Sequence, residues 1–299
     1  MKKLLLTLCL IGLSFGSASQ AEPVNAIWSF NIANTQGTYF RTIMNEANRL
    51  QSRYQISVDS RPGAGGQIAA TYVAEQKPLT LLGTTYAFFI RPNLYQVPYS
   101  FDQFRLLHVM TVAPPALVTK NKTLEQILSQ NVITIGTAGP GTGTHLNALK
   151  FKESLPNKNI VIAPYKSSTE ALRDVMGGHI DLTFEYMADA EGSGAKILGV
   201  AGNKKVANYP LLKDMGFPNQ ADMVNSYFIL VKNDISEEHY QELQKLMIRA
   251  EKIPAVQELY RKDHSSKPDG LTTPAGYRAW YHQNIKFWQN ATKGMRVDQ

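Results

Sequence analysis

Cysteine is almost absent from this sequence: Cys9 is the only one in 299 residues. It lies within an apolar N-terminal segment that we expect to be removed, so the mature chain would contain no cysteine. Disulfide bonds, zinc–thiolate sites, iron–sulfur ligation and a cysteine nucleophile are thereby excluded. The remaining chain from residue 22 onward is long enough for about two domains with an ample core.

Long apolar runs are equally scarce. One stretch, Leu4 to Phe15, follows Lys2 and Lys3 and precedes the small-residue segment Ser19–Ala21. This order is typical of a secretory signal peptide, and the run is well short of the ~20 residues that a membrane span requires. We therefore expect cleavage after Ala21 and export to the periplasm. Because the cysteine lies inside the run and not beside the cleavage point, we expect no lipid anchor.

Motifs of catalysis are also missing. The six histidines form no His-Glu-x-x-His pair, and no Gly-x-Ser-x-Gly elbow occurs. Thr142 and His145 could be imagined as nucleophile and base on one helical face, but no orienting acid accompanies them. In the simpler interpretation, Thr142 and Thr144 cap a helix and His145 is a neutral hydrogen-bonding group. We therefore predict no catalytic residue, no metal site, no cofactor and no enzymatic activity.

Charge of one sign is not concentrated anywhere in the sequence. Without residues 1–21, 29 Lys and Arg stand against 24 Asp and Glu, a net charge of +5. No dense Lys/Arg stripe with interleaved aromatics occurs, so nucleic acid is not an expected partner. The mild positive excess suits anionic solutes, although a solvated basic surface accounts for most of these charges.

Short β-rich runs alternate with helical patterns, which indicates an α/β architecture with largely parallel strands. We expect a first strand at 26–32, followed by a helix that Thr38 caps and that buries Phe40, Ile43 and Ala47. Further strands are predicted at 55–59, 79–83, 132–136, 160–164 and 181–184, and helices at 67–76, 168–176 and from 237 onward.

Two glycine-rich loops, 61–66 and 137–143, each lie between a predicted strand and a predicted helix start. Open α/β sheets bind ligands at the carboxyl ends of parallel strands. Glycine lets backbone N–H groups approach a ligand, and a helix start favours anions. Neither loop matches a Walker A or Rossmann fingerprint. Either loop alone could be a simple turn, but the two together favour an anion-binding cleft.

Four motifs occur in a characteristic order: Arg-Pro-Gly-Ala-Gly-Gly at 61–66, Gly-Thr-Ala-Gly-Pro-Gly-Thr-Gly-Thr-His-Leu at 136–146, Pro-Tyr-Lys-Ser-Ser at 164–168 and Gly-Gly-His-Ile-Asp-Leu-Thr-Phe-Glu at 177–185. In these motifs the chain resembles the Bug-type solute receptors of tripartite tricarboxylate transport (TTT) systems, over nearly all of the mature sequence. The first loop departs from the pattern. Residues 31–38 replace the Pro-Ala-Gly-Gly segment and following aspartate of the family.

The resemblance implies an α/β, two-lobed type II periplasmic-binding-protein fold with a ligand cleft between the lobes. Lobe 1 would comprise residues 22–121 and 225–299, and lobe 2 residues 122–224, with crossings near 119–123 and 223–226. The expected function is a monomeric extracytoplasmic solute-binding protein that captures a small carboxylate for membrane transporter subunits. The alternative is a periplasmic ligand sensor that feeds a signalling partner such as a sensor kinase.

The resemblance also implies that loops from both lobes grip the carboxylate through backbone amides, hydroxyls and ordered water. The predicted ligand-binding residues are Thr35, Gln36, Thr84, Thr85, Tyr86, Ala138, Gly141, Thr142, Gly143, Thr144, Tyr165 and Glu185. Tyr86 and Tyr165 fit the core as well as the cleft wall. Glu185, if charged, would orient water or a ligand amine.

Overall fold

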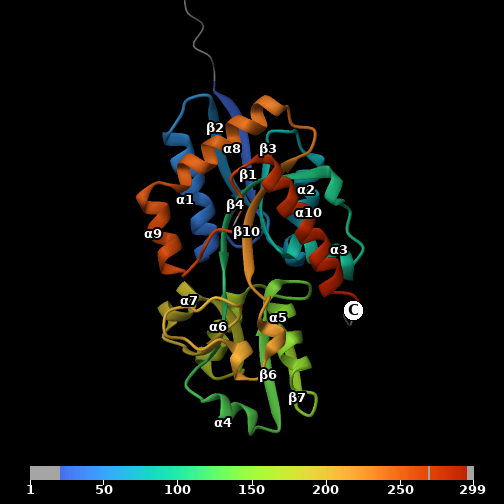
Figure 1. Ribbon diagram of the computed structural model, residues 1–299, viewed down its shortest axis with the longest axis vertical. Helices are drawn as coiled ribbons and strands as arrows, with labels where there is room; N and C mark the ends of the chain where they lie inside the picture. Colours follow the sequence, from blue (N-terminus) through green and yellow to red (C-terminus); the bar gives the residue numbers. More distant parts are fainter. Residues whose placement is uncertain (1–20, 269, 295–299) are drawn as a thin grey trace, which may run out of the picture.

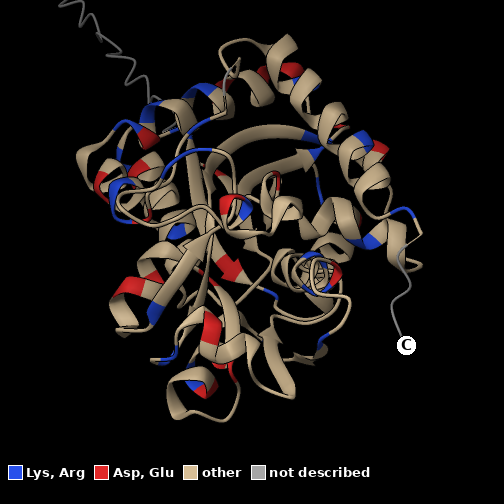
Figure 2. Ribbon diagram, turned by 60° about the horizontal axis from the view of Figure 1, so that its bottom comes forward, with Lys and Arg blue, Asp and Glu red and all other residues tan. Residues whose placement is uncertain are grey.

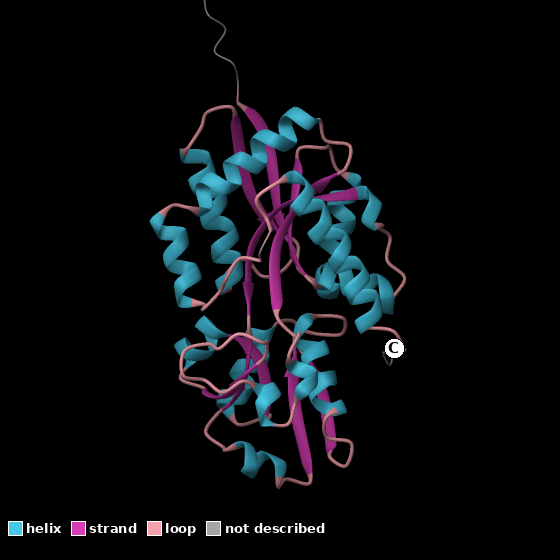
Figure 3. Ribbon diagram, viewed as in Figure 1, coloured by secondary structure: helices cyan, strands magenta, loops and turns pink. Residues whose placement is uncertain are grey.

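The computed structural model describes residues 21–268 and 270–294, which form two β-sheets in two lobes (Figure 1). The predicted signal peptide covers residues 1–21, of which residues 1–20 lie outside the described residues, and it stays a prediction. The strand order is β2-β1-β3-β10-β4 in the first sheet and β7-β6-β8-β5-β9 in the second. Helices flank both sheets (Figure 3).

The first sheet consists of β1 (Glu22–Trp28), β2 (Tyr54–Ser60), β3 (Thr80–Thr85), β4 (Phe104–Ala113) and β10 (Asn225–Lys232). Strands β1, β2 and β3 are parallel, whereas β10 runs antiparallel to β3 and β4. The helices of this lobe are α1 (Thr35–Arg49), α2 (Gln67–Glu75), α3 (Ala87–Leu94), α8 (Glu237–Glu251), α9 (Pro254–Lys262) and α10 (Pro274–Ala291), with 3-10 turns at Ala64–Gly66 and Phe101–Gln103.

The first strand and helix show how local sequence shapes the cleft. Strand β1 ends at Trp28, four residues before the predicted end, so residues 29–34 become a loop. Helix α1 buries Phe40 and Ile43 at the predicted spacing, but its cap is Asn34 and not Thr38. The Asn34 side chain accepts from the N–H of Gly37, which satisfies one of the unpaired donors of the first turn.

The second sheet consists of β5 (Pro115–Thr119), β6 (Val132–Thr137), β7 (Asn159–Pro164), β8 (Leu182–Tyr186) and β9 (Lys196–Val200). Strand β6 is parallel to β7 and β8, and β5 is antiparallel to β8 and β9. Its helices are α4 (Leu124–Leu128), α5 (Gly143–Glu153), α6 (Ser168–Gly177) and α7 (Met187–Ser193), with 3-10 turns at Leu212–Met215 and Pro218–Gln220.

The chain passes between the lobes at two points (Figure 1). The first passage was expected near 119–123, with lobe 1 running to residue 121. Strand β5 instead pairs with β8 and β9 of the second sheet, so the passage lies at Pro114, between β4 and β5. The second passage precedes Asn225, where β10 joins the first sheet. The division of the chain into the predicted folding units stays a prediction.

Aromatic packing fixes one face of the first sheet. The ring of Phe228 on β10 stacks on Phe89 with centroids 5.1 Å apart, and Trp280 of α10 meets Phe228 edge-on at 5.5 Å. Helices α1 and α8 cover the opposite face with a second buried cluster that includes Ile43 and Met247. The sheet is therefore sandwiched, and its strand ends lie in a fixed position next to the second lobe.

Charged side chains are distributed over both lobes. Figure 2 shows Lys and Arg interspersed with Asp and Glu over helices and loops, with no continuous basic stripe in that view. Within the described residues, none of the helices has the length and apolar character that a bilayer crossing requires.

Candidate functional site

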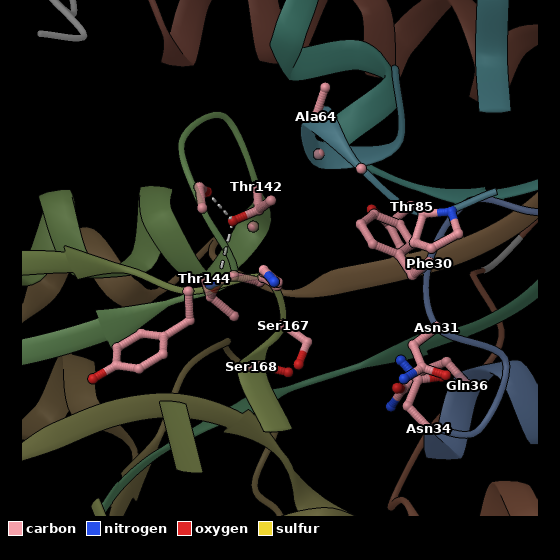
Figure 4. A pocket seen from close by; sticks show the side chains of 18 of the residues that line it. Phe30, Asn31, Asn34, Gln36, Ala64, Thr85, Thr142, Thr144, Ser167 and Ser168 are labelled. Carbon is pink, nitrogen blue, oxygen red and sulfur yellow. Dashed lines mark hydrogen bonds between the residues drawn. The ribbon is translucent and has the colours of Figure 1, made fainter. Parts of the chain in front are cut away.

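A cleft of about 780 Å³ lies between the two lobes (Figure 4). Residues of the first lobe that line it are Trp28, Phe30, Asn31, Asn34, Gln36, Ser60, Pro62–Gly65, Thr85, Arg91, Tyr95, Asn225 and Tyr227. Residues of the second lobe that line it are Ala138–Pro140, Thr142–Thr144, Pro164–Ser168, Glu170 and Tyr186. A volume of this size is typical of sites that enclose a small molecule.

Seven of the residues predicted from sequence line this cleft: Gln36, Thr85, Ala138, Thr142, Gly143, Thr144 and Tyr165. Thr35, Thr84, Tyr86, Gly141 and Glu185 do not. The structure thus brings the first loop, the end of β3 and the loop after β6 to one place. The ligand-binding role of each residue stays a prediction.

Two of the residues outside the lining are buried for reasons of packing. Tyr86 lies in the aromatic core, with its ring centroid 4.8 Å from that of Trp288, and burial raises the pKa of its hydroxyl above the usual range. Thr84 is 1% exposed on β3. Thr85, between them, faces the cleft, because successive residues of a strand point to opposite faces.

Three helices begin at the cleft: α1, α5 and α6. A capping side chain satisfies one N–H of each first turn: Asn34 for α1, Thr142 for α5 and Ser167 for α6. The first two N–H groups of each helix have no partner among the described residues. Unpaired N–H groups and the helix dipole favour negative charge at a helix start. The cleft is therefore built to attract an anion.

Within the loop before α5, two of the backbone N–H groups predicted to bind an anion instead donate to side chains at the start of α5. The N–H of Ala138 donates to the hydroxyl of Thr144 at 2.9 Å, and the N–H of Gly141 donates to Nδ1 of His145 at 3.2 Å. His145 accepts this bond as a neutral ring, because burial lowers its pKa to about 4. The N–H groups of the loop and helix start that have no partner among the described residues include those of Gly143 and Thr144.

Arg91 of α3 is a cleft residue that the sequence analysis missed. Its side chain lines the cleft although the residue is only 8% exposed, and burial lowers its pKa. Nη1 donates to the carbonyl of Pro140 in the second lobe at 2.9 Å, and Nη2 donates to Oε1 of Gln67 at 3.0 Å. The guanidinium also lies 4.5 Å from the ring centroid of Tyr95. All of these partners, within the part of the chain that the structure describes, are neutral.

The two glycine-rich loops surround this arginine. Gly65 has φ +58° and Gly141 has φ +76°, and a Cβ at either would lie 3.0 or 3.3 Å from Nη1 of Arg91. Each lobe therefore contributes one glycine to the close packing around the guanidinium. A Cβ at Gly143 would instead lie 2.2 Å from Oδ1 of Asn225. The sequence predicts that the glycines of the second loop allow close approach of a ligand; at Gly141 the group that approaches closely is the side chain of Arg91.

A signal for Arg91 was present in the sequence. Helix α3 starts Ala87-Phe88-Phe89-Ile90, all of them buried, and Arg91 interrupts this apolar run just before Pro92. A single charge within a buried segment is rare unless the charge is paired or functional. Asn31, Asn34, Ser60, Ser167, Asn225 and Tyr227 also line the cleft, and they come from segments too far apart in sequence to be grouped without the fold.

Three carboxyl groups lie behind the cleft: Glu185, Asp189 and Asp263. Oε1 of Glu185 accepts from the hydroxyl of Ser168, which lines the cleft, at 3.0 Å. Burial, with the charge of Asp189, raises the pKa of Glu185 to about 8, and burial raises the pKa of Asp263 to about 7. Burial also raises the pKa of Asp189. Burial therefore favours the protonated form of each of these three carboxyl groups in the folded protein.

Two of these carboxyl groups connect the lobes. The hydroxyl of Thr35, at the start of α1, donates to Asp189 of α7. The N–H of Ala188 donates to Oδ1 of Asp263 at 3.1 Å. Together with the contact between Arg91 and Pro140, these bonds hold the lobes across the cleft. No cluster of three or more His, Cys, Asp or Glu suited to a metal ion occurs in residues 21–268 and 270–294.

The fold is that of the two-lobed periplasmic binding proteins. The chain superposes on the periplasmic binding protein BugD with a TM-score of 0.82 and 20% identity, over 91% of this chain and 97% of that chain. It superposes on MatC from Rhodopseudomonas palustris with bound malate with a TM-score of 0.80 and 19% identity, over 91% and 99% of the two chains. The predicted two-lobed α/β fold is confirmed.

Residues 40–269 match the model of the family described as tripartite tricarboxylate transporter family receptor, and the chain belongs to this family. The predicted resemblance is thereby confirmed. A curated relative, "UPF0065 protein in the TAR-I ttuE-ttuC' intergenic region" of Agrobacterium vitis, is 32% identical over 143 residues, or 43% of this chain and 40% of that protein. A second, "UPF0065 protein in gbd 5'region" of Cupriavidus necator, is 24% identical over 65% of this chain and 64% of its own length. The chain thus spans less than two thirds of the length of these curated relatives.

Proposed function

We propose that this protein is an exported, monomeric receptor that captures a small carboxylate-bearing solute and delivers it to the membrane subunits of a tripartite tricarboxylate transporter. The first 21 residues would direct export and be removed. Membership of the receptor family supports this function. The observation that carries it is the start of α5, where two N–H groups face the same cleft as the buried Arg91. Within the part of the chain that the structure describes, these N–H groups have no hydrogen-bond partner and Arg91 has no acidic partner.

The carboxylate would bind at the start of α5. The N–H groups of Gly143 and Thr144 are its donors there, and the helix dipole adds to their attraction. The loop is held in place by internal bonds, since the hydroxyl of Thr142 donates to the carbonyl of Gly139 at 2.7 Å (Figure 4). Such preorganised donors need little rearrangement when the anion enters.

Arg91 would supply the positive charge. A buried cation that is bonded only to neutral groups is costly, because its desolvation is not offset by an opposite charge. Entry of a carboxylate into the cleft offsets that cost. Since Nη1 of Arg91 also contacts Pro140 of the other lobe, the same residue links solute binding to the closed arrangement of the lobes.

The family and its relatives support the same class of solute. Structures that share this fold contain malate or, in a second Rhodopseudomonas palustris protein with a TM-score of 0.80 and 20% identity over 91% of this chain and 96% of that one, adipate. Both are small carboxylates that a cleft of this volume accommodates. We extend this class to the present chain because its own α5 start and Arg91 fit a carboxylate.

The receptor would not transform its solute. The hydroxyl of Thr142 donates to a backbone carbonyl, and Nδ1 of His145 accepts from the N–H of Gly141. His145 is therefore not positioned as a base for Thr142, and a general base must reach the proton that it removes. This geometry supports binding without turnover.

The test is a thermal-shift titration of residues 22–299 with three- to six-carbon carboxylates and their uncharged amides. At a concentration about 100 times the Kd, a carboxylate stabilises the folded state by about 2.7 kcal/mol, which raises the Tm by roughly 5–10 °C. We expect at least one carboxylate to produce this shift and its amide to produce none. Equal shifts from a carboxylate and its amide, or no shift from any carboxylate, would contradict the proposed function.

A further inference from the structure

The two ends of the cleft differ in electrostatic character. At one end lie Arg91 and the start of α5, next to the loop that contains Ala64. At the other end lie Asn31, Asn34 and Gln36, with Ser168 opposite (Figure 4). The acidic side chain that lines the cleft, Glu170, accepts from the backbone N–H of Lys166 and so belongs to the start of α6.

Each helix start at the Gln36 end already has a carboxyl group beside it. Asp189 accepts from Thr35 at the start of α1, Glu185 accepts from Ser168 at the start of α6, and Asp263 accepts from Ala188 near the start of α7. Carboxyl groups at helix starts offset the positive end of the dipole. The start of α5 has no such carboxyl group among the described residues. The Arg91 end therefore combines a cationic side chain with a helix start that no carboxyl group offsets; Lys166, just before α6, is the other cationic side chain of the lining.

Gln36 gives an independent sign of a ligand at the acidic end. The residue is 1% exposed and lines the cleft, yet neither its amide oxygen nor its amide nitrogen has a hydrogen-bond partner among the described residues. A buried amide without partners costs about 1–3 kcal/mol for each unsatisfied group. The side chain is thus placed for a polar group that enters the cleft, and its oxygen offers an acceptor.

We infer, on the basis of the proposed function, that the solute carries an ammonium group at the end opposite its carboxylate. The carboxylate binds between Arg91 and the start of α5, and the ammonium group binds beside Gln36, where the carboxyl cluster of Glu185, Asp189 and Asp263 attracts it. A second carboxylate at that end would keep the cluster protonated and gain no ion pair there, whereas an ammonium group gains an ion pair as the cluster ionises. The receptor therefore selects amino acids with separated charges over dicarboxylates of equal length.

The carboxyl cluster should change its protonation when the solute binds, and the protons released or taken up can be measured. Burial raises the pKa of Glu185 to about 8 and of Asp263 to about 7. A nearby cation lowers the pKa of a carboxyl group, so an ammonium solute would release protons on binding near neutral pH. A carboxylate there would raise the pKa and take protons up. The other titratable groups around the cluster are Tyr39, Tyr186, Tyr260, Glu191 and His264.

Isothermal titration calorimetry of the mature protein with matched solute pairs tests the inference. The pairs are 4-aminobutanoate with succinate and 6-aminohexanoate with adipate, each at pH 7.5 in phosphate and in Tris, whose ionisation enthalpies differ. For at least one pair we expect the amino acid to bind at least 10-fold more tightly and with proton release. Dicarboxylates that bind as tightly as the amino acids, or amino-acid binding without proton release, would overturn it.

Two variants test whether the carboxyl cluster causes the preference for the amino acid and the proton release. Glu185→Gln, and independently Asp189→Asn, should reduce the preference for the amino acid about 10-fold and reduce the proton release, because each removes one ionisable group of the cluster. Asp234→Asn, an exposed carboxyl with its side chain 60% accessible, is the matched control and should change neither. Circular dichroism confirms that each variant is folded. If both cluster variants keep the full preference, the inference is wrong.

The outcomes separate the two proposals. If dicarboxylates bind and amino acids do not, the carboxylate receptor stands and only the ammonium site fails. If no carboxylate of either kind binds, the proposed function itself fails, and the ammonium site with it.

Discussion

Arg91 is the residue whose contacts say most about the solute. Charge-assisted hydrogen bonds contribute about 1.5–3 kcal/mol each, so Arg91→Gln should weaken carboxylate binding about 10- to 100-fold. Calorimetry with the identified solute measures the loss. Arg105→Gln is the control, because Arg105 also stacks on an aromatic ring, that of Tyr240 at 3.5 Å, but lies outside the cleft lining. Unchanged affinity in the Arg91 variant would contradict a charge-assisted contact.

His145 tests whether the protein performs chemistry. His145→Ala removes the acceptor for the N–H of Gly141, which should lower stability by about 1–3 kcal/mol and reduce affinity at most. We expect no turnover in either protein when the solute is followed by NMR over hours. Steady conversion by the wild type that disappears in His145→Ala would contradict the receptor function.

At the residue scale, the sequence predicted which residues lie near the cleft better than it predicted where their side chains point. Gln36, Thr85 and the Thr142–Thr144 segment could be predicted because each lies next to a strand end or a helix start. The side chain of Tyr86 could not be placed, because its direction depends on the alternation at the end of β3 and on the aromatic core that receives it. Arg91 was missed because its neighbours are apolar and its partners come from both lobes.

At the scale of elements, the glycines of the loop before α5 and of its helix start should not tolerate a larger side chain. Gly141→Val should cost about 1–3 kcal/mol of stability, because φ there is +76°. It should also abolish detectable binding, since a Cβ lies 3.1 Å from Cγ of Arg91 and displaces that side chain. Gly143→Val should have the same effect on binding through Asn225, whose Oδ1 would lie 2.2 Å from the new Cβ.

Calorimetry combined with thermal melts separates affinity from stability in these loop variants. Gly192→Val is the matched control, because its φ is not positive and no atom lies within 4 Å of the added Cβ. We expect wild-type affinity in the control. Folded Gly141 and Gly143 variants with wild-type affinity would show that this loop is only a turn.

Periodicity predicted α1 and six of the ten strands in the described residues, namely β1, β2, β3, β6, β7 and β8, but not every boundary; β4, β5, β9 and β10 were not predicted. The buried spacing of Phe40 and Ile43 follows from burial of one helical face, whereas the cap depends on the turn that the loop makes before Thr35. The passage at Pro114 was missed for a related reason. Strands β4 and β5 are separated by a single residue, and strand pairing assigns them to different sheets.

At the scale of the whole molecule, the buried carboxyl cluster couples stability to pH. The folded-state pKa values of Glu185 and Asp263 are raised to about 8 and about 7, above the unfolded values near 4. Between the unfolded and the folded pKa values, the folded chain binds more protons than the unfolded chain. The stability that the two protonated carboxyl groups contribute is therefore fully present below pH 4 and is lost as pH rises towards 8. Buried His108 and His145, with pKa values lowered to about 4, act in the opposite sense below about pH 6.5.

Thermal melts at pH 5 and pH 8 check this coupling in the solute-free protein. Wild type should lose more stability over this interval than Glu185→Gln, by on the order of 2–4 kcal/mol, because the variant lacks the group that resists ionisation. Asp234→Asn should follow wild type. Equal pH dependence in wild type and Glu185→Gln would mean that Glu185 ionises freely in the folded state.

The two-lobed architecture was predictable at this scale because four motifs occur in family order over the whole chain. The difference between the two ends of the cleft was not predictable, since it arises from Arg91, from Asp263 and from the neighbouring Glu185 and Asp189. These three segments are distant in sequence and are placed around one cleft only when the lobes come together. Three of these side chains contact the other lobe.

The central claim is that the start of α5, together with Arg91, binds the carboxylate of the solute. A crystal structure of the protein with its solute bound tests this claim most directly. We predict carboxylate oxygens within hydrogen-bonding distance of the N–H groups of Gly143 and Thr144 and of the Arg91 guanidinium, with both lobes in contact with the solute. A carboxylate bound beside Gln36 or outside the cleft, with the two α5 amides bonded to water, would contradict it.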